Sequence, residues 1–483
     1  MASRFGQHAR RLLRRSAAFP ERLHLVHHHN GDGSEHNNGK LPIPGLPTGP
    51  SVPDDTRVQQ VLDLAIRVGE VLLSSGEGVA ETTAIMLRLA DAGGLPACDV
   101  DITFTSITMC CHRGMAAPPV TTMRLVRYRS LDLTRLADVE RLMQRLHRYE
   151  LDLTEAAAEL EEITRAKHPY PRWVATMAWA FMAGSVALLL GGGWVAAGVA
   201  LGATALMDRI GRLLNRLGLP IFFQQLTGAL VATGLTAMLL YFHVLPEGTR
   251  PSLVVAAALT VLLSGLSVVG AARDGIDGFF LTAAGRAAEI AMLSSALLAG
   301  VVLALKAAIH FNVEFAVAGQ LPGSTGSTVL QVISAGLAAA FFALAGYSPV
   351  RHLAAAGGTG AAGYGIYLIL VHLDFGPVVA TGVAAVVLGG LAGLLRRFTN
   401  VPALVITLAG ITPLLPGLTA YRGFYQLAVT GVTDGLVTVM LALAIGGALA
   451  GGVSLGEWTT SKLGSDPDET RAVVTSSPGA PGQ

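Results

Sequence analysis

The residues with the greatest capacity for chemistry are polar side chains that lie inside or beside long apolar segments. We single out Gln224, Gln225, Thr227, Asp274, Asp277, Glu289, Thr407, Thr412, Arg422 and Gln426. An ionisable group within a bilayer is energetically costly and usually has a function, such as contact with a solute. The alternative is that several of these groups lie at the depth of the lipid headgroups, where a charge costs little. Their chemistry favours noncovalent binding of a small polar molecule.

A second set of reactive side chains lies in the polar N-terminal third: Glu77, Glu81, Thr103, Thr105, Ser106, Thr108 and His112. A glutamate close to threonines could act as the acid or base of a hydrolase. However, Glu81 falls in the first turn of a predicted helix, where a carboxylate interacts favourably with the helix dipole. Threonines are also ordinary strand formers. Residues 57–171 contain no GxSxG, HExxH or Walker A pattern, so regulation or gating is favoured over catalysis.

The cysteines are Cys98, Cys110 and Cys111, and all three lie in the polar third. An odd number without a disulfide framework indicates a reducing compartment and predicts a cytoplasmic location. Cys110 and Cys111 with His112 resemble a metal cluster, but neighbours on a strand point to opposite faces and would not readily share an ion. The first forty residues hold six histidines and no apolar h-region, which predicts a solvated tail rather than a signal peptide. A histidine-rich metal tract is the alternative, but the expectation is no metal and no cofactor.

The composition indicates an integral membrane protein. Hydrophobic residues make up 52% of the chain and charged residues only 14%, and the mean hydropathy is +0.53. Most charges lie in residues 1–171, whereas 172–458 consists of long runs of Ala, Val, Leu and Gly. The net charge of +1 hides this uneven distribution of charges. The sequence has no basic face with interleaved aromatic residues, so it does not indicate binding to nucleic acid. The sequence therefore predicts that the protein is embedded in the lipid bilayer.

A small α+β domain is predicted over 57–171, behind a disordered basic and histidine-rich tail and linker at 1–56. Apolar residues at helical spacing predict a helix over 61–72, and further helices are predicted over 79–92, 134–148 and 153–166. Asp152 and Glu155 have the spacing of a capping box at the start of the last one. Strands are predicted at 100–104, 107–111 and 121–128. Because only residues 168–172 separate this domain from the first apolar segment, we expect it to pack against the membrane part.

Ten transmembrane helices are predicted, since one span needs about 20 apolar residues. They lie at 173–190, 194–207, 220–242, 252–270, 283–305, 329–346, 353–371, 377–395, 401–415 and 427–453. Residues 459–483 form a polar tail that is expected to be disordered. The fold class is therefore a polytopic α-helical membrane protein preceded by a small soluble α+β domain.

The distribution of basic residues predicts the orientation. With the N-terminus inside, the inner connections carry Arg209, Arg212, Arg216, Arg273, Arg286, Arg351, Arg396 and Arg397. The outer connections carry only Arg250, Lys306 and Arg422. Excess positive charge marks the cytoplasmic side, so both termini are predicted to be cytoplasmic, in a multi-pass protein of the inner cell membrane.

An internal echo suggests a duplication. Ser264-Gly265-Leu266-Ser267, followed by Arg273-Asp274, resembles Pro416-Gly417-Leu418-Thr419, followed by Tyr421-Arg422. Each block lies near the fourth span of its half, and halves of five spans must have opposite orientation. This predicts two inverted five-span repeats, 172–310 and 327–458, an arrangement typical of secondary transporters. The alternative is that small residues recur in any glycine-rich membrane helix.

At these residues the chain resembles the threonine/serine exporter family, in the form that fuses two parts into one polypeptide. The matching pieces are Ser75-Gly76, Glu81-Thr82, the strand 103–107, Tyr170-Pro171-Arg172-Trp173, Gly191-Gly192-Gly193-Trp194, Arg273-Asp274, Leu415-Pro416-Gly417 and Tyr421-Arg422. In the soluble domain the motif therefore includes Gly76, Glu81, Thr103 and Thr105. The chain departs from the family pattern at one place: it has Ser264-Gly265 where Pro-Gly is expected in the first half. This difference affects how sharply the first-half helix is expected to break.

The resemblance implies export of threonine and serine, driven by the proton motive force. Both are zwitterions, so a site needs an anion for the ammonium group, which Asp274 supplies, and a donor for the carboxylate, which Arg422 supplies. Pro416 and Gly417 would let the helix break there. Gly265, Arg273 and Tyr421 are expected beside this site. The alternative is that Asp274 and Arg422 are gates at opposite surfaces, roughly 30 Å apart.

Two other functions remain open. Related split proteins are associated with dicarboxylate export, so the same architecture could carry another small acid. A membrane-anchored enzyme or sensor with its activity in 57–171 is the third hypothesis. The expected partners are a small amino acid and protons, with no ATPase because the chain lacks a Walker A motif. The sequence leaves open whether copies form a homo-oligomer.

Overall fold

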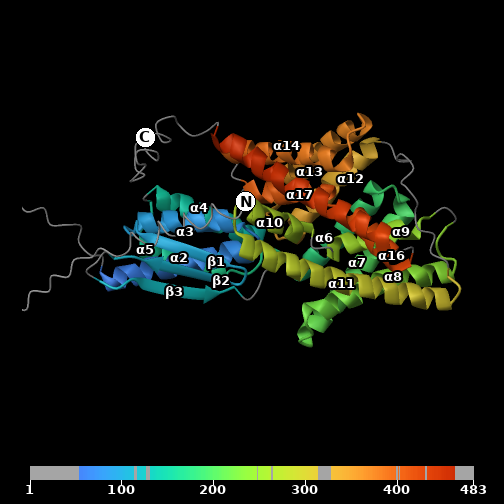
Figure 1. Cartoon of the computed structure of the whole chain (residues 1–483), viewed down its shortest axis with the longest axis horizontal. Helices are drawn as coiled ribbons and strands as arrows, with labels where there is room; N and C mark the ends of the chain where they lie inside the picture. Colours follow the sequence, from blue (N-terminus) through green and yellow to red (C-terminus); the bar gives the residue numbers. More distant parts are fainter. Residues whose placement is uncertain are drawn as a thin grey trace, which may run out of the picture. The chain divides into compact units, whose positions relative to one another are not determined.

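The computed structural model describes residues 54–113, 117–126, 131–148, 150–246, 249–262, 265–313, 328–398, 401, 403–429 and 432–462. Almost all of the two predicted tails, 1–56 and 459–483, therefore lies outside the described residues, as does Ser264. The described helices and strands belong to the stretch from Asp55 to Lys462, and Figure 1 labels most of them in chain order.

The N-terminal unit is a three-stranded sheet with four helices. Its helices are α2 (Asp55–Ser74), α3 (Val79–Ala92), α4 (Leu133–His147) and α5 (Leu153–Arg165), and its strands are β1 (Cys98–Thr103), β2 (Ser106–Cys111) and β3 (Val120–Leu125). The strands are antiparallel in the order β1-β2-β3, with Thr103 opposite Ser106 at the hairpin. The predicted small α+β arrangement is confirmed, and the capping box of Asp152 and Glu155 is present.

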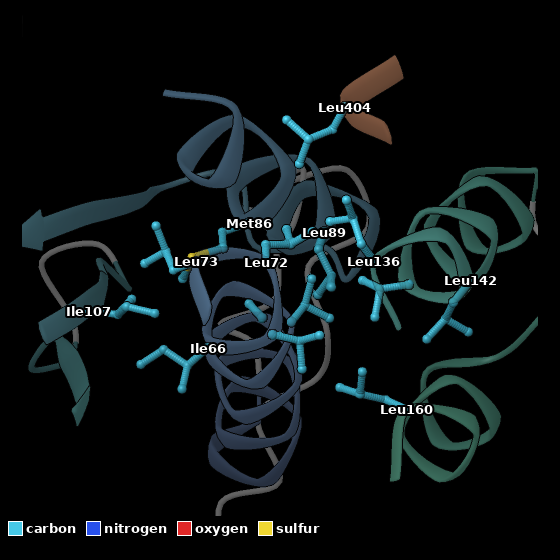
Figure 2. Close-up of a cluster of buried hydrophobic side chains, with 14 of the residues drawn as sticks. Ile66, Leu72, Leu73, Met86, Leu89, Ile107, Leu136, Leu142, Leu160 and Leu404 are labelled. Atoms are coloured by element: carbon cyan, nitrogen blue, oxygen red, sulfur yellow. The ribbon is translucent and has the colours of Figure 1, made fainter. Parts of the chain in front are cut away.

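Helix α2 is the centre of this unit because most of its residues from Val58 to Leu73 are buried. Figure 2 shows Ile107 of the sheet on one side of α2, and Leu136, Leu142 and Leu160 of α4 and α5 on the other. Alternation along β2 buries Ile107, Met109 and Cys111 toward the helix. Cys110 therefore faces away from Cys111, as the strand geometry predicts.

The helical part follows without a long connection. It contains α6 (Arg172–Leu189), α7 (Gly193–Arg216), α8 (Ile221–Tyr241), α9 (Pro251–Leu262), α10 (Gly265–Ile276), α11 (Phe280–His310), α12 (Thr328–Ala345), α13 (Val350–His372), α14 (Pro377–Phe398), α15 (Ala403–Ile411), the 3₁₀ turn η1 (Thr412–Leu414), α16 (Gly417–Val429) and α17 (Val432–Lys462). Gly191 and Gly193 have φ of 80° and 72°, and this left-handed turn separates α6 from α7.

Seven of the described helices are long and apolar enough to cross a membrane, and up to nine spans result if each bent pair counts as one. The two bent pairs are α9 with α10, at 52°, and α15 with α16, at 46°. Helix α7 is not among these spans because Asp208 and Arg209 lower its hydropathy. The helical, polytopic fold is as predicted, but the predicted count of ten is not confirmed.

The N-terminal unit packs on the helical part through several polar contacts. The hydroxyl of Thr282 in α11 donates to the carbonyl of Ile102 in β1, over 3.1 Å. The amide of Leu133 donates to the carbonyl of Gly346 at the end of α12, over 2.9 Å. The rings of His168 and Tyr347 stack at 4.3 Å. The expected packing of the unit on the helices is therefore observed.

Candidate functional site

The two broken helices meet in the interior of the helical part. Pro416 lies in the break before α16, and Gly417 is its first residue. Thr260 lies in the last turn of α9, and a Cβ built on Gly417 would come within 2.6 Å of its Oγ1. Only glycine allows this approach, so the break of the second half lies directly against the end of α9 in the first half. The departure at Ser264-Gly265 does not weaken the first bend, which at 52° is as sharp as the second.

A cavity of about 640 Å³ lies at these breaks. Thr260 of α9, Val268 of α10, and Leu415, Pro416 and Gly417 of the second break line it. Apolar residues of α10, α11, α16 and α17 complete the wall, and among the described lining residues the side-chain polar groups are the hydroxyls of Thr260 and Ser294. Solute sites are typically apolar cavities with a few polar groups, and a broken helix also presents its N-terminal amides to a ligand.

Tyr421 and Arg422 follow one turn later on α16. Tyr421 is only 1% exposed and packs with the apolar residues of α8, α9 and α11. Arg422 is half-buried. Neither Arg422 nor Asp274 lines the 640 Å³ cavity, so the structure does not join them there as one pocket for a zwitterion. The roles of Arg422 and of Gly265, which begins α10, remain predictions.

Asp274 lies instead at the contact between α10 and the N-terminal unit. Its Oδ1 accepts a hydrogen bond of 3.2 Å from the backbone amide of Val79, at the start of α3. Its Oδ2 lies 3.2 Å from Nε of Arg286 in α11. The side chains of Asp274 and Arg286 are 0% and 9% exposed. A buried carboxylate needs such partners, because an unpaired buried charge is costly.

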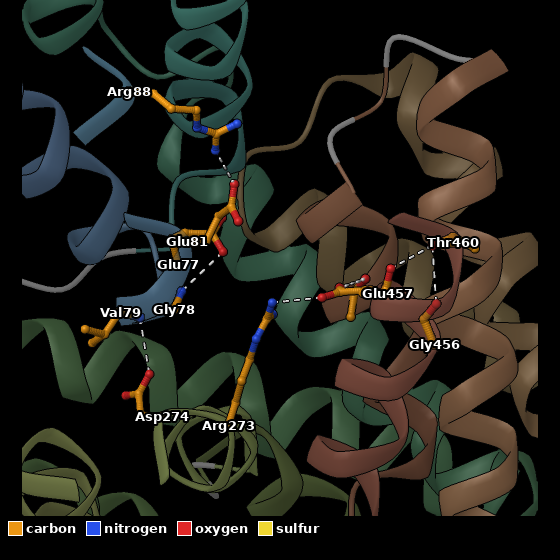
Figure 3. A network of polar contacts seen from close by, with 11 residues as sticks. Glu77, Gly78, Val79, Glu81, Arg88, Arg273, Asp274, Gly456, Glu457 and Thr460 are labelled. Carbon is orange, nitrogen blue, oxygen red and sulfur yellow. Dashed lines mark hydrogen bonds and ion pairs between the residues drawn. The ribbon is translucent and has the colours of Figure 1, made fainter. Parts of the chain in front are cut away.

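Arg273 and Glu457 extend this contact into the second half of the chain. Nη2 of Arg273 donates to Oε2 of Glu457 in α17, over 2.8 Å. The hydroxyl of Thr407 in α15 donates to the other oxygen of Glu457, over 3.2 Å. Figure 3 shows Arg273 pointing to Glu457, while Asp274 points to Val79. We call Glu77, Arg273, Asp274, Arg286 and Glu457 the junction cluster, because it joins the N-terminal unit to both halves.

Glu77 is the titratable member of this cluster that lies outside the helical part. It is 5% exposed, and its Oε1 accepts from the amide of Gly78 over 3.2 Å. Burial raises the pKa of its carboxyl to about 8, whereas the charge of Arg273 opposes this increase. Near neutral pH, Glu77 can therefore gain or lose a proton.

A polar cavity of about 550 Å³ adjoins the junction cluster. Carboxyl groups from three parts of the chain line it together with Arg273: Glu77, Glu81, Glu140, Asp277 and Glu457. This lining attracts cationic groups, and the guanidinium offers a partner for a carboxylate. Within the described residues, no group of three histidine, cysteine or acidic side chains is placed to hold a metal ion.

The other predicted residues of the N-terminal unit serve its local structure. Gly76 ends α2 with φ of 100°, a conformation that favours glycine. Glu81 forms an ion pair of 3.0 Å with Arg88. The hydroxyls of Thr103 and Ser106 lie 2.5 Å apart across the hairpin, and Thr105 is exposed in its turn. The described contacts do not pair these threonines with a carboxylate, so the hydrolase arrangement is not assembled.

Sequence reasoning missed Arg286 and Glu457. The sequence counts Arg286 among the basic residues of the inner connections, but it lies within the long helix α11. Glu457 was placed beyond the last span, whereas α17 continues to Lys462 and carries this carboxylate into the structure. The isolated acid after a long apolar run was the available signal.

Comparison with known proteins gives a consistent result. The family model described as "Putative threonine/serine exporter" matches residues 63–308, and the one described as "Threonine/Serine exporter, ThrE" matches 331–458. A protein of Mycobacterium tuberculosis named "Probable threonine/serine exporter" is 39% identical over 417 residues, covering 85% of this chain and 78% of the relative. The "Threonine/serine exporter" of Corynebacterium glutamicum is 34% identical over 430 residues, covering 88% and 87%.

A more distant relative matches about half of the chain. The "Probable succinate transporter subunit YjjP" of Escherichia coli is 24% identical over 245 residues, covering 51% of this chain and 93% of the relative. No solved structure shows a significant match. The family matches and the two high-identity relatives show that this chain is a multi-pass membrane protein and belongs to the threonine/serine exporter family.

Proposed function

We propose that this protein exports threonine and serine from the cytoplasm and that the proton motive force drives the export. The names of the two high-identity relatives support this substrate class. The structural observation that carries the proposal is the contact between the second helix break and the end of α9, Gly417 against Thr260, beside the 640 Å³ cavity. Broken helices in corresponding positions of two halves are typical of the solute site of a secondary transporter.

The transport cycle follows from the two bent helices. The breaks let α10 and α16 tilt relative to α9 and α15, so that the cavity opens first to one side and then to the other. The junction cluster is a gate on the side of the N-terminal unit. It is closed when Val79 bonds Asp274 and Arg273 pairs with Glu457.

Glu77 supplies a site at which a proton can act on this gate. When it is protonated, Arg273 pairs with Glu457 alone, and when it is ionised, two carboxylates compete for one guanidinium. A proton that enters in exchange for the solute therefore changes the charge balance of the junction cluster. In this proposal, the change in charge at the junction cluster couples proton entry to export of the solute.

The proposed topology keeps ten spans, with both termini in the cytoplasm. Helix α7 has 24 residues, which at about 1.5 Å per residue is long enough to cross a bilayer. Its charged last third would lie at the cytoplasmic surface, where arginines are favoured. The bent pairs then lie in the fourth and ninth spans, as two inverted five-span repeats require.

Transport against an imposed pH gradient tests the proposal. Proteoliposomes that contain the full chain should move labelled threonine and serine when a proton gradient is applied, and a protonophore should abolish the movement. Movement that is insensitive to the protonophore would exclude proton coupling. A dicarboxylate is the second candidate, since relatives named "Probable succinate transporter subunit YjjP" match half of the chain. Transport of labelled succinate but not of threonine would favour it.

A further inference from the structure

A separate cavity of about 470 Å³ lies among α6, α7, α8 and α9. Trp179, Thr204, Asp208, Arg212, Gln225 and Leu262 are among the residues that line it. Among the residues that the structure describes, it shares no lining residue with the cavity at the two breaks. Its volume falls within the roughly 300–1,000 Å³ of small-molecule sites, and its wall carries both charged and neutral polar groups.

The cavity presents a positive and a negative group side by side. Nη2 of Arg212 lies 2.6 Å from Oδ2 of Asp208. The hydroxyl of Thr176 donates to the same carboxylate over 2.7 Å and accepts from Arg212 over 2.8 Å. Thr176 is only 1% exposed, so it fixes both side chains from the protein interior. The pair is held in place, while each partner is still a quarter or more exposed.

Two polar groups in the same wall lack a hydrogen-bond partner within the described part of the chain. They are Oγ1 of Thr204, which is 1% exposed, and Oε1 of Gln225. Buried polar groups are normally paired, and those left unpaired call for an explanation. The amide nitrogen of Gln225 donates to the carbonyl of Leu262 over 3.3 Å, at the last residue of α9. The side chain of Gln225 therefore lies beside the end of α9.

We infer that this cavity binds an α-amino acid with a hydroxyl on its side chain. Arg212 takes the carboxylate in its two-pronged guanidinium, and Asp208 takes the ammonium group. The substrate hydroxyl donates to Oε1 of Gln225 and accepts from Thr204, which pairs both unpaired groups. A dicarboxylate fits poorly, because Asp208 would repel its second charge.

The inference rests on the proposed function and names an entry site for its substrate. If α7 ends in the cytoplasm, the cavity opens to the compartment from which the solute is exported. Gln225 contacts both the bound hydroxyl and the carbonyl at the end of α9, so binding is communicated to the bent helix. The substrate then passes from this site to the cavity at the breaks.

Equilibrium binding of labelled L-threonine to the purified full chain in nanodiscs tests the site. Thr204→Val keeps the side-chain shape and removes only the hydroxyl, and it should weaken threonine binding up to about tenfold. It should leave binding of L-alanine, which has no hydroxyl, unchanged. Asp208→Asn should weaken both amino acids, but not 3-hydroxybutyrate, which has no ammonium group.

Thr233→Val is the matched control. Thr233 in α8 is also fully buried with an unpaired Oγ1 among the described residues, but it does not line this cavity. It should bind threonine like the wild type. Equal threonine affinity in wild type, Thr204→Val and Asp208→Asn would overturn the site, as would equal losses in Thr204→Val and Thr233→Val. If the wild type transports threonine while these variants bind normally, only the site is wrong. If the wild type neither binds nor transports threonine, the proposed function fails as well.

Discussion

The backbone amide of Val79 donates a hydrogen bond of 3.2 Å to the carboxylate of Asp274, although the two residues are 195 positions apart in the chain. Val79 begins α3, where the helix N-terminus carries a partial positive charge that favours a carboxylate. Arg286 in α11 balances the negative charge of the same carboxylate. The N-terminal unit is therefore joined electrostatically to the bent helix of the first half, which makes it a candidate gate rather than a separate module.

Replacing Asp274 with Asn should open this contact. The amide can still accept from Val79, but it leaves the positive charge of Arg286 without its carboxylate. Removing one partner of a buried ion pair typically costs about 3–5 kcal/mol. We expect a lower melting temperature in detergent, slower transport and faster proteolysis of the N-terminal unit. Asp434→Asn, at an exposed position in α17, is the control and should behave like the wild type. Normal transport by Asp274→Asn would exclude a gating role.

Replacing Gly417 with Ala should impair transport by pushing the second break away from the end of α9. The added Cβ would lie 2.6 Å from Oγ1 of Thr260 and 3.2 Å from its Cγ2. Thr260→Ala removes both atoms, so the double variant should recover most of the transport rate. Gly202→Ala in α7, where a Cβ meets nothing within 4 Å, is the control. A double variant no better than Gly417→Ala would mean that the contact with Thr260 is not the cause.

Replacing Glu77 with Gln should alter the dependence of stability on pH. The folded-state pKa of Glu77 is about 8, above its usual 4.5. Between these values the folded protein binds more protons than the unfolded chain, so this group's contribution to stability is lost as pH rises toward 8. The melting temperature of the wild type should fall as the pH rises from 4.5 to about 8, and that of Glu77→Gln should fall less over the same range. The comparison variant Asp91→Asn removes an exposed carboxylate of α3 that does not contribute to the shift at Glu77, and it should retain the slope of the wild type. Parallel slopes for wild type and Glu77→Gln would contradict the assignment.

Local sequence patterns predicted the helices and strands well, because these elements depend mainly on residues that are close together in the chain. The apolar spacing from Val61 to Leu72 predicted α2, although the helix begins earlier, at Asp55, since polar residues extend its first turn. The echo at Gly265 and Gly417 pointed to the two positions where helices are bent. Proline and glycine act on the local backbone, so their effect can be read from the sequence.

The junction cluster could not be predicted in the same way. Arg273 and Glu457 are 184 residues apart, and no spacing rule links residues whose contact depends on how helices pack. From charge complementarity alone, the sequence predicts that Asp274 and Arg422 bind the two charged groups of one zwitterion, with gates at opposite surfaces as the alternative. The structure gives Asp274 two nearer partners, Val79 and Arg286, because the N-terminal unit packs on α10 and α11.

The proposed topology predicts that reporters in two loops will be extracytoplasmic. One lies at 246–250, before α9, and the other at 322–328, before α12. The asymmetric distribution of arginines predicts that both loops lie outside the cytoplasm. The loop at 246–250 can lie outside only if α7 crosses the membrane. A reporter at Leu217, between α7 and α8, should be cytoplasmic. If the loop at 246–250 is cytoplasmic instead, α7 does not cross and the count of ten spans is wrong.

Counterflow in proteoliposomes tests the central claim, the identity of the exported solute, most directly. Vesicles loaded with unlabelled threonine, serine or succinate are diluted into a trace of the labelled compound, and only a transported solute drives transient uptake of label. We predict overshoot for threonine and serine, none for succinate, and a reduced overshoot for Gly417→Ala. Overshoot with succinate alone, or equal overshoot in vesicles without protein, would contradict the account.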